Sequence, residues 1–196
     1  MLSLGVTGGI GSGKSYVSRL FAALNIPVYE ADSQTKQLYG RNENLRLALI
    51  ALLGDDIYNN GVLQREVMAA KIFANQTLLA QVNRLVHPAV MFDFSTWSAQ
   101  QHTPYVILES AILLETPFAA TVDRMITVSA PVSLRLERLC HRDNVSAKDV
   151  RLRMEKQWSD SMRESKSDFV IYSDGKAPLL PQVLAIHQAM LALVDT

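Results

Sequence analysis

The chain of 196 residues has a single cysteine, Cys140, which excludes an intrachain disulfide and is consistent with a reducing compartment. It also has no excess charge of either sign, since nineteen acidic residues balance nineteen basic ones. No overall field is therefore present to attract nucleic acid or an anionic membrane surface. The N-terminus lacks the basic region and cleavage site of a signal peptide, so the expected location is cytoplasmic. No obligate protein partner is evident.

One stretch without charge, Ala177–Val194, approaches the minimum length of a membrane span. Two prolines break its start, and Gln182, His187 and Gln188 interrupt the rest. Its apolar residues instead recur on one face of a helix, at Val183, Ile186, Met190 and Val194. We expect a C-terminal helix that closes the core, and no membrane segment.

The strongest signal in the chain is Gly8-Gly9-Ile10-Gly11-Ser12-Gly13-Lys14-Ser15, a G-x-x-x-x-G-K-S motif. Its glycines allow a tight turn whose N–H groups face a chain of phosphates, and the positive end of the following helix strengthens that field. Lys14 reaches the β- and γ-phosphates in such a loop, and the Ser15 hydroxyl ligates Mg²⁺. The motif predicts a nucleoside triphosphate site.

The flanks of the motif have the order that it requires. Leu2, Leu4 and Val6 form a short apolar strand before it, and residues 16–24 repeat apolar side chains at helical spacing after it. A glycine-rich turn that binds nothing is the alternative, and the strand, loop and helix order disfavours it.

Further short apolar runs predict strands near residues 27–29, 105–108, 125–128 and 169–172. Such runs separated by helical segments favour a parallel sheet covered on both faces, of five strands in all. Residues 33–100 are expected to form a helical insertion, in which Gly54–Gly61 is a turn-rich linker.

Nine of the nineteen basic residues lie between positions 135 and 166. A solvated helical face, with acidic partners that include Asp160, is the ordinary explanation. The sharper hypothesis is a mobile lid whose arginines close over the phosphates of a nucleotide.

Three carboxylates are candidates for chemistry because they follow predicted strands, where ligands of such sheets gather. Glu30 and Asp32 share one side if the chain stays extended there, and either can accept a proton from a hydroxyl or hold magnesium through water. Glu109 is a third candidate, with capping of the next helix as its alternative role. His87-Pro88 is expected to start a helix, and a capping or packing role for His87 stays open.

Taken together, the motifs resemble the dephospho-coenzyme A kinase family, a branch of the P-loop kinases. The resemblance runs along nearly the whole chain. It rests on the following segments: Leu4–Ser15, Ala31-Asp32, Gly61–Arg65, Ile72-Phe73-Ala74-Asn75, Leu85–Pro88, Leu113–Glu115, Arg142-Asp143, Asp168–Ile171 and Asp174-Gly175.

The resemblance implies an α/β P-loop three-layer fold, with a core of about 1–32, 101–134 and 167–196, a helical acceptor-binding insertion at 33–100 and a helical lid at 135–166. It implies transfer of the ATP γ-phosphoryl group to the ribose 3′-hydroxyl of dephospho-CoA, the last step of coenzyme A synthesis, with Mg²⁺. Asp32 matches the proposed base of the family. Arg142 matches a lid position that contacts ATP, and Arg65 and His87 lie on the acceptor side. The expected ATP contacts are Gly9, Gly11, Ser12, Gly13, Lys14, Ser15 and Tyr16.

Glu30 stands where the family commonly has Asp, and the sequence after Glu109 departs from the common pattern. Both residues are therefore left without a role by analogy. Another P-loop kinase for nucleotides or sugars is the main alternative. A non-kinase NTPase is more distant, because the chain has no Asn-Lys-x-Asp guanine reader and no apolar strand that ends in Asp-Glu.

Overall fold

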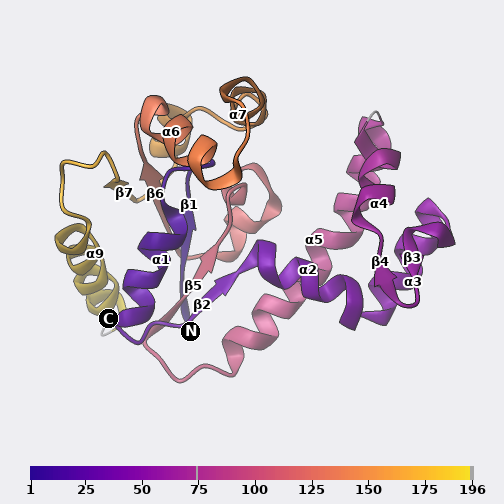
Figure 1. Ribbon diagram of the computed structural model, residues 1–196. Helices are drawn as coiled ribbons and strands as arrows, with labels where there is room; N and C mark the ends of the chain where they lie inside the picture. Colours follow the sequence, from indigo (N-terminus) through magenta and orange to yellow (C-terminus); the bar gives the residue numbers. More distant parts are fainter. Residues whose placement is uncertain (74, 195–196) are drawn as a thin grey trace. The chain divides into compact units, whose positions relative to one another are not determined.

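The computed structural model describes residues 1–73 and 75–194, so Ala74 of the Ile72–Asn75 motif lies outside the described residues. The chain divides into two compact units. The sheet unit comprises Met1–Glu30 and the chain from Ser98 onward, and the helical unit comprises Ala31–Trp97. Figure 1 shows the elements of each unit. Whether they form one kinase domain with an insertion and a lid stays a prediction.

A parallel sheet forms the centre of the sheet unit. Its five strands are in the order β2-β5-β1-β6-β7. The bounds are β1 Leu2–Thr7, β2 Val28–Glu30, β5 Tyr105–Glu109, β6 Arg124–Ser129 and β7 Phe169–Tyr172. The predicted parallel five-stranded sheet is confirmed, and its continuous apolar runs match strands that are buried on both faces.

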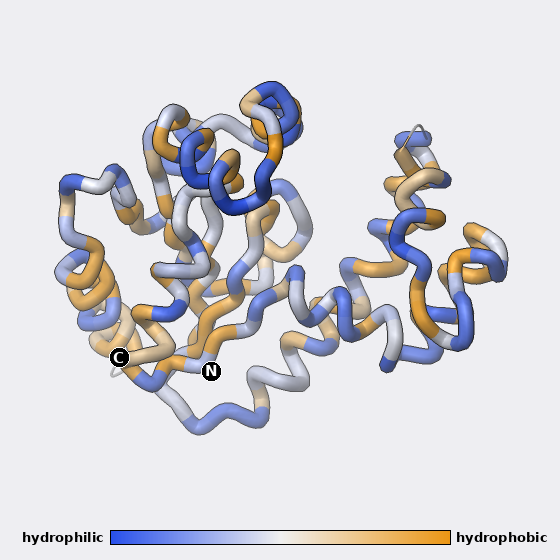
Figure 2. The backbone as a smooth tube through the Cα atoms, in the orientation of Figure 1, coloured by the Kyte–Doolittle hydropathy of each residue, from blue (hydrophilic) through white to orange (hydrophobic). Residues whose placement is uncertain are grey.

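Helices cover both faces of this sheet. On one face, α1 (Lys14–Ala23) and α9 (Leu179–Val194) bury Val17, Phe21 and Met190 against apolar strand residues. Figure 2 shows these strands and α9 as largely hydrophobic. On the other face, Gly5 leaves room for Leu113 and neighbouring side chains from the segment that holds η2 (Leu113–Glu115) and η3 (Pro117–Thr121).

The remaining helices of the sheet unit follow β6. They are α6 (Val132–Asp143), α7 (Ala147–Met154) and α8 (Asp160–Glu164). Among the described residues, no helix has the length and apolarity needed to cross a membrane, and α9 is the core helix expected from the sequence, with Val183, Ile186 and Met190 buried.

The helical unit holds α2 (Ala31–Arg41), α3 (Glu43–Leu53), α4 (Arg65–Phe73) and most of α5 (Gln76–Ala99). Gly54–Gly61 does separate α3 from α4, as expected, but it also contains η1 (Asp55–Ile57) and most of a β-hairpin, which the linker prediction did not include. Its strands are β3 (Tyr58–Asn59) and β4 (Val62–Leu63), paired antiparallel. Asn60 and Gly61, both with positive φ, form the two-residue turn.

Candidate active site

The phosphate-binding loop connects the end of β1 at Thr7 to the start of α1 at Lys14. Gly8 has φ +149°, and a Cβ there would collide with the carbonyl oxygen of Val128 in β6. Gly13, at the N-cap of α1, is left-handed with φ +102°. Both positions need glycine, so the spacing of the motif is a requirement of this backbone path.

Lys14 and Ser15 place their functional groups at the base of the loop. The Lys14 ammonium donates to the carbonyl oxygen of Gly8 at 3.0 Å and of Gly9 at 3.4 Å. The Ser15 hydroxyl donates to Oε1 of Glu109 at 3.1 Å. A cation and a hydroxyl therefore lie beside the loop that the motif assigns to phosphates.

Glu109 is the last residue of β5, and its carboxyl group is buried next to the loop. Burial raises its pKa, whereas Ser18, Lys14 and the hydrogen bond from Ser15 lower it and the negative charge of Glu30 raises it further. Its Oε2 atom is buried without a hydrogen-bond partner. Its place at a strand end was predictable, and its contact with Ser15 is the feature that the sequence did not reveal.

The chain does not stay extended from Glu30 to Asp32, so the condition under which the two side chains would share one side is not met. β2 ends at Glu30, opposite Glu109 in the register, and α2 begins at Ala31. Asp32 lies exposed in the first turn of α2. Glu30 belongs to a strand and Asp32 to a helix, so the two-residue spacing does not place their side chains on one side.

The basic residues of α6 are only in part a solvated face. The Arg138 guanidinium donates to the carbonyl oxygens of Gly11 at 3.3 Å and Ser12 at 3.2 Å, and Arg135 Nε donates to that of Ile10 at 2.9 Å. Asp160, expected as a surface partner, pairs with buried Arg135. The sequence placed both arginines in a solvated face or a lid and did not reveal their contacts with the loop, although their spacing of three residues places them on one helix face.

Arg142 follows on the same helix but is exposed. Its guanidinium binds the Asp143 carboxylate through Nε at 2.7 Å and Nη2 at 3.1 Å, and this hydrogen bond raises its pKa. Arg142 thus lies one helical turn beyond Arg138, outside the contacts with the loop.

The helical unit carries Arg65 and His87. Arg65 is exposed at the first residue of α4, near Tyr39, whose pKa is raised by burial and lowered by the charge of Arg65. His87 and Pro88 lie inside the long helix α5, so the prediction that they start a helix is wrong. Burial lowers the pKa of His87.

Within residues 1–73 and 75–194, no three His, Cys, Asp or Glu side chains gather as a metal cluster. Oxygen ligands at the loop are a different case, since Mg²⁺ is usually bound by one or two protein oxygens together with water and phosphates. The Ser15 hydroxyl and the unpartnered Oε2 of Glu109 fit that requirement.

Comparison with known proteins identifies the family. Residues 2–178 match the family model described as dephospho-CoA kinase. A relative from Bacteroides fragilis is 39% identical over 94% of this chain and 91% of its own length, and one from Porphyromonas gingivalis is 42% identical over 97% and 95%. Both are named dephospho-CoA kinase.

Solved structures agree in fold. A crystal structure from Thermus thermophilus has a TM-score of 0.86 at 26% identity, and a dephospho-CoA kinase from Campylobacter jejuni has 0.68 at 17%, each covering 97% of both chains. A shikimate kinase from Acinetobacter baumannii, at 14% identity, has a TM-score of 0.55 over 98% of this chain and 94% of its own length. The chain therefore belongs to the dephospho-CoA kinase family of P-loop phosphotransferases.

Proposed function

We propose that this chain transfers the γ-phosphoryl group of ATP to the ribose 3′-hydroxyl of dephospho-CoA, giving coenzyme A and ADP. The observation that carries the proposal is the loop between β1 and α1, with Lys14, Ser15 and Glu109 gathered at its base. Phosphoryl transfer depends on positioning and on charge stabilisation more than on covalent chemistry. A preformed loop with a cation is suited to that demand.

The loop is proposed to hold the phosphates of ATP through its backbone N–H groups and Lys14. The expected contact positions are Gly9, Gly11, Ser12, Gly13, Lys14, Ser15 and Tyr16. In this structure the amides of Ser12 and Tyr16 donate to Gly9 and Gly13 of the loop. Lys14 now donates to loop carbonyls, and in the proposed complex its ammonium turns to the β- and γ-phosphates.

Mg²⁺ is proposed to bind at the Ser15 hydroxyl, with Glu109 holding one of its waters. A bound Mg²⁺ neutralises charge on the β- and γ-phosphate oxygens. The contribution of the chain is to present Ser15 from the first turn of α1 and to fix its hydroxyl against Glu109.

Glu109→Gln is expected to raise thermal stability at neutral pH while lowering the apparent Mg²⁺ affinity or turnover by roughly 10- to 100-fold. Burial raises the folded-state pKa of Glu109, so its ionisation destabilises the fold as pH rises above its ordinary value of 4.5. The gain in Tm should therefore be absent below that pH and grow above it. Tm against pH and Mg²⁺ titrations of turnover measure both effects.

The matched control is Glu155→Gln, the same change at an exposed residue that directly follows α7. It should alter neither the pH dependence of Tm nor the Mg²⁺ response. A Glu109→Gln variant with normal Mg²⁺ response would remove Glu109 from the proposed site.

Asp32 is proposed to accept the proton of the acceptor hydroxyl, and Arg142 to contact ATP from a lid formed by residues 135–166. Asp32 is exposed, as a group that meets substrate must be. Arg142 is free to exchange Asp143 for a phosphate because its ion pair lies at the surface, where such pairs contribute little.

Arg65 and His87 are proposed to contact dephospho-CoA. Arg65 offers an exposed guanidinium at the start of α4, which suits phosphate groups. The lowered pKa of His87 favours a neutral ring that hydrogen-bonds without carrying charge. A cytoplasmic location and the absence of nucleic-acid, membrane and obligate protein partners stay predictions.

A panel of acceptors tests the proposed function. ADP release with Mg-ATP is measured with dephospho-CoA, AMP, other nucleoside monophosphates, shikimate and gluconate. Stimulation by dephospho-CoA alone is expected. Stimulation by another acceptor would retain the kinase chemistry and replace the substrate, and ATP hydrolysis without response to any acceptor would favour a non-kinase NTPase.

A further inference from the structure

A network of ion pairs with two buried arginines meets the phosphate-binding loop and is not used by the chemistry above. Arg135 and Arg163 are 4% and 1% exposed, which is unusual for arginine unless it is paired. Asp160 joins them, accepting from Arg135 Nη1 at 2.7 Å and from Arg163 Nη1 at 3.2 Å. Arg163 Nη2 reaches Glu115 at 3.1 Å. Positive and negative charges alternate in this network of ion pairs, and the two arginines are balanced by the two carboxylates.

Arg135, at one end of this network of ion pairs, contacts the loop at Gly9 and Ile10. The Arg135 guanidinium lies so close to Gly9 that a Cβ there would overlap it. Its Nε donates to the Ile10 carbonyl oxygen at 2.9 Å. The absence of a side chain at Gly9 therefore lets the guanidinium rest directly on the loop backbone.

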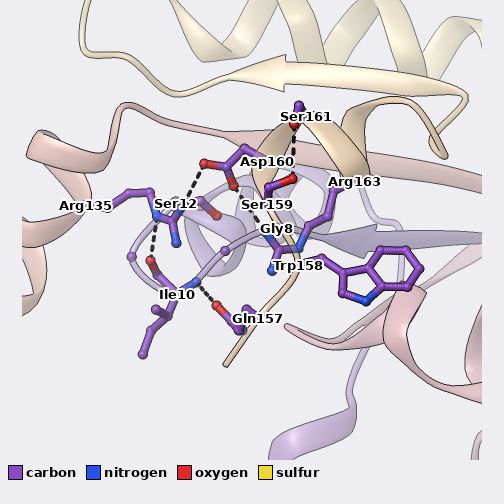
Figure 3. A network of polar contacts seen from close by, with 12 residues as sticks. Gly8, Ile10, Ser12, Arg135, Gln157, Trp158, Ser159, Asp160, Ser161 and Arg163 are labelled. Carbon is purple, nitrogen blue, oxygen red and sulfur yellow. Dashed lines mark hydrogen bonds and ion pairs between the residues drawn. The ribbon is translucent and has the colours of Figure 1, made fainter. Parts of the chain in front are cut away.

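Gln157 binds the backbone N–H of Ile10, the residue whose carbonyl oxygen Arg135 contacts. Its Oε1 accepts a hydrogen bond from the Ile10 N–H at 2.9 Å. The next residue, Trp158, donates its backbone N–H to Glu115 at 3.1 Å, which anchors the segment between α7 and α8. Figure 3 shows Gln157 and Arg135 meeting Ile10, while the indole of Trp158 points away from the loop.

We infer that Arg135 and Gln157 are positioning residues for ATP: together they fix the Ile10 backbone, so that the loop has its phosphate-binding shape before ATP arrives. Asp160 holds Arg135 in place, and Arg163 and Glu115 hold Asp160. Because Asp160 neutralises Arg135, this arginine acts through the loop and leaves phosphate charge to Lys14. The inference rests on the part of the proposed function that puts ATP in the loop.

Loss of either contact should weaken ATP binding, because the free loop then samples other shapes and binding must restrict it again. A hydrogen bond of ordinary net strength corresponds to roughly a 3- to 10-fold increase in Kd for ATP. The KM for dephospho-CoA should stay unchanged, since neither residue is placed on the acceptor side.

The test is isothermal titration of ATP into Gln157→Leu, Arg135→Gln, their double variant and a control. The control is Gln182→Leu, because Gln182 also accepts from a backbone N–H, that of Tyr172 at 2.8 Å, away from Ile10. It should lower Tm without changing the Kd for ATP. Circular dichroism confirms that each variant is folded, and the KM for dephospho-CoA is measured in parallel.

Two results support the inference. The first is a roughly 3- to 10-fold increase in the Kd for ATP in each of Gln157→Leu and Arg135→Gln. The second is a fold-increase in Kd in the double variant that is smaller than the product of the two single fold-increases, since both residues act on Ile10. An unchanged Kd in Gln157→Leu, or an equal increase in Gln182→Leu, would overturn it. Wild-type protein that binds no ATP would contradict the proposed function as well, whereas ATP binding without transfer to dephospho-CoA would affect the proposed function alone.

Discussion

Asp32→Asn is expected to lower kcat for dephospho-CoA phosphorylation by roughly 10² to 10⁴ while the Kd for ATP stays near wild type. The change replaces the proposed proton acceptor by an amide of equal size. It leaves the loop, Lys14 and Ser15 untouched, so donor binding should persist. Steady-state kinetics and titration of ATP separate the two effects.

Asp55→Asn is the matched control, because Asp55 is also exposed, lies in the same unit and begins the short helix η1. It should retain wild-type kcat. Near-normal turnover of Asp32→Asn would reject Asp32 as the base. A loss of ATP binding in that variant would place Asp32 on the donor side instead.

Lys14→Ala is expected to reduce turnover and ATP affinity together. Removing the ammonium leaves the charge of the β- and γ-phosphates without its protein cation in both the ground state and the transition state. Loss of a charge-assisted contact corresponds to roughly a 10- to 100-fold weaker Kd for ATP, with a further loss in kcat. Titration of ATP and single-turnover transfer measure the two parts.

Arg124→Ala supplies the control, since Arg124 is a partly exposed cation at the first residue of β6, whereas the loop follows the last residue of the parallel strand β1. Neither ATP binding nor transfer should change in it. If Lys14→Ala bound ATP and transferred phosphate normally, the assignment of residues 8–15 as the phosphate-binding loop would be wrong.

Much of the sheet unit was predictable from sequence because its signals are local. Strands buried on both faces consist of consecutive apolar residues, as in Tyr105–Leu108, and such runs stand out between polar segments. The loop was predictable because its glycine spacing is visible in the sequence, and Gly8 and Gly13 have positive φ angles that favour glycine. The proposed roles of Lys14 and Ser15 follow from their places at the end of the G-x-x-x-x-G-K-S motif.

Element boundaries in the helical unit were less predictable, because competing local signals point in different directions. Pro88 suggested a helix start, yet Val82, Val86, Val90 and Phe94 bury one face of α5 on both sides of it. The β-hairpin was interpreted as a linker because each of its strands has only two residues. Asn60-Gly61 was the signal for the hairpin turn.

The contacts between distant segments had no sequence signal. Arginine is usually exposed, so the segment 135–166 suggested a solvated face or a lid. Only the fold brings Asp160 to Arg135, and Gln157 to Ile10 across 147 positions of sequence. The same reason applies to Glu109, whose place at a strand end was visible and whose hydrogen bond with Ser15 was not.

The most direct test is the mass of the product formed from Mg-ATP and dephospho-CoA, compared with an analogue that has hydrogen in place of the ribose 3′-hydroxyl. We predict that dephospho-CoA gains one phosphoryl group with one ADP released per product, and that the analogue gains none. A phosphorylated analogue, or ADP released without any phosphorylated acceptor, would contradict the proposed reaction.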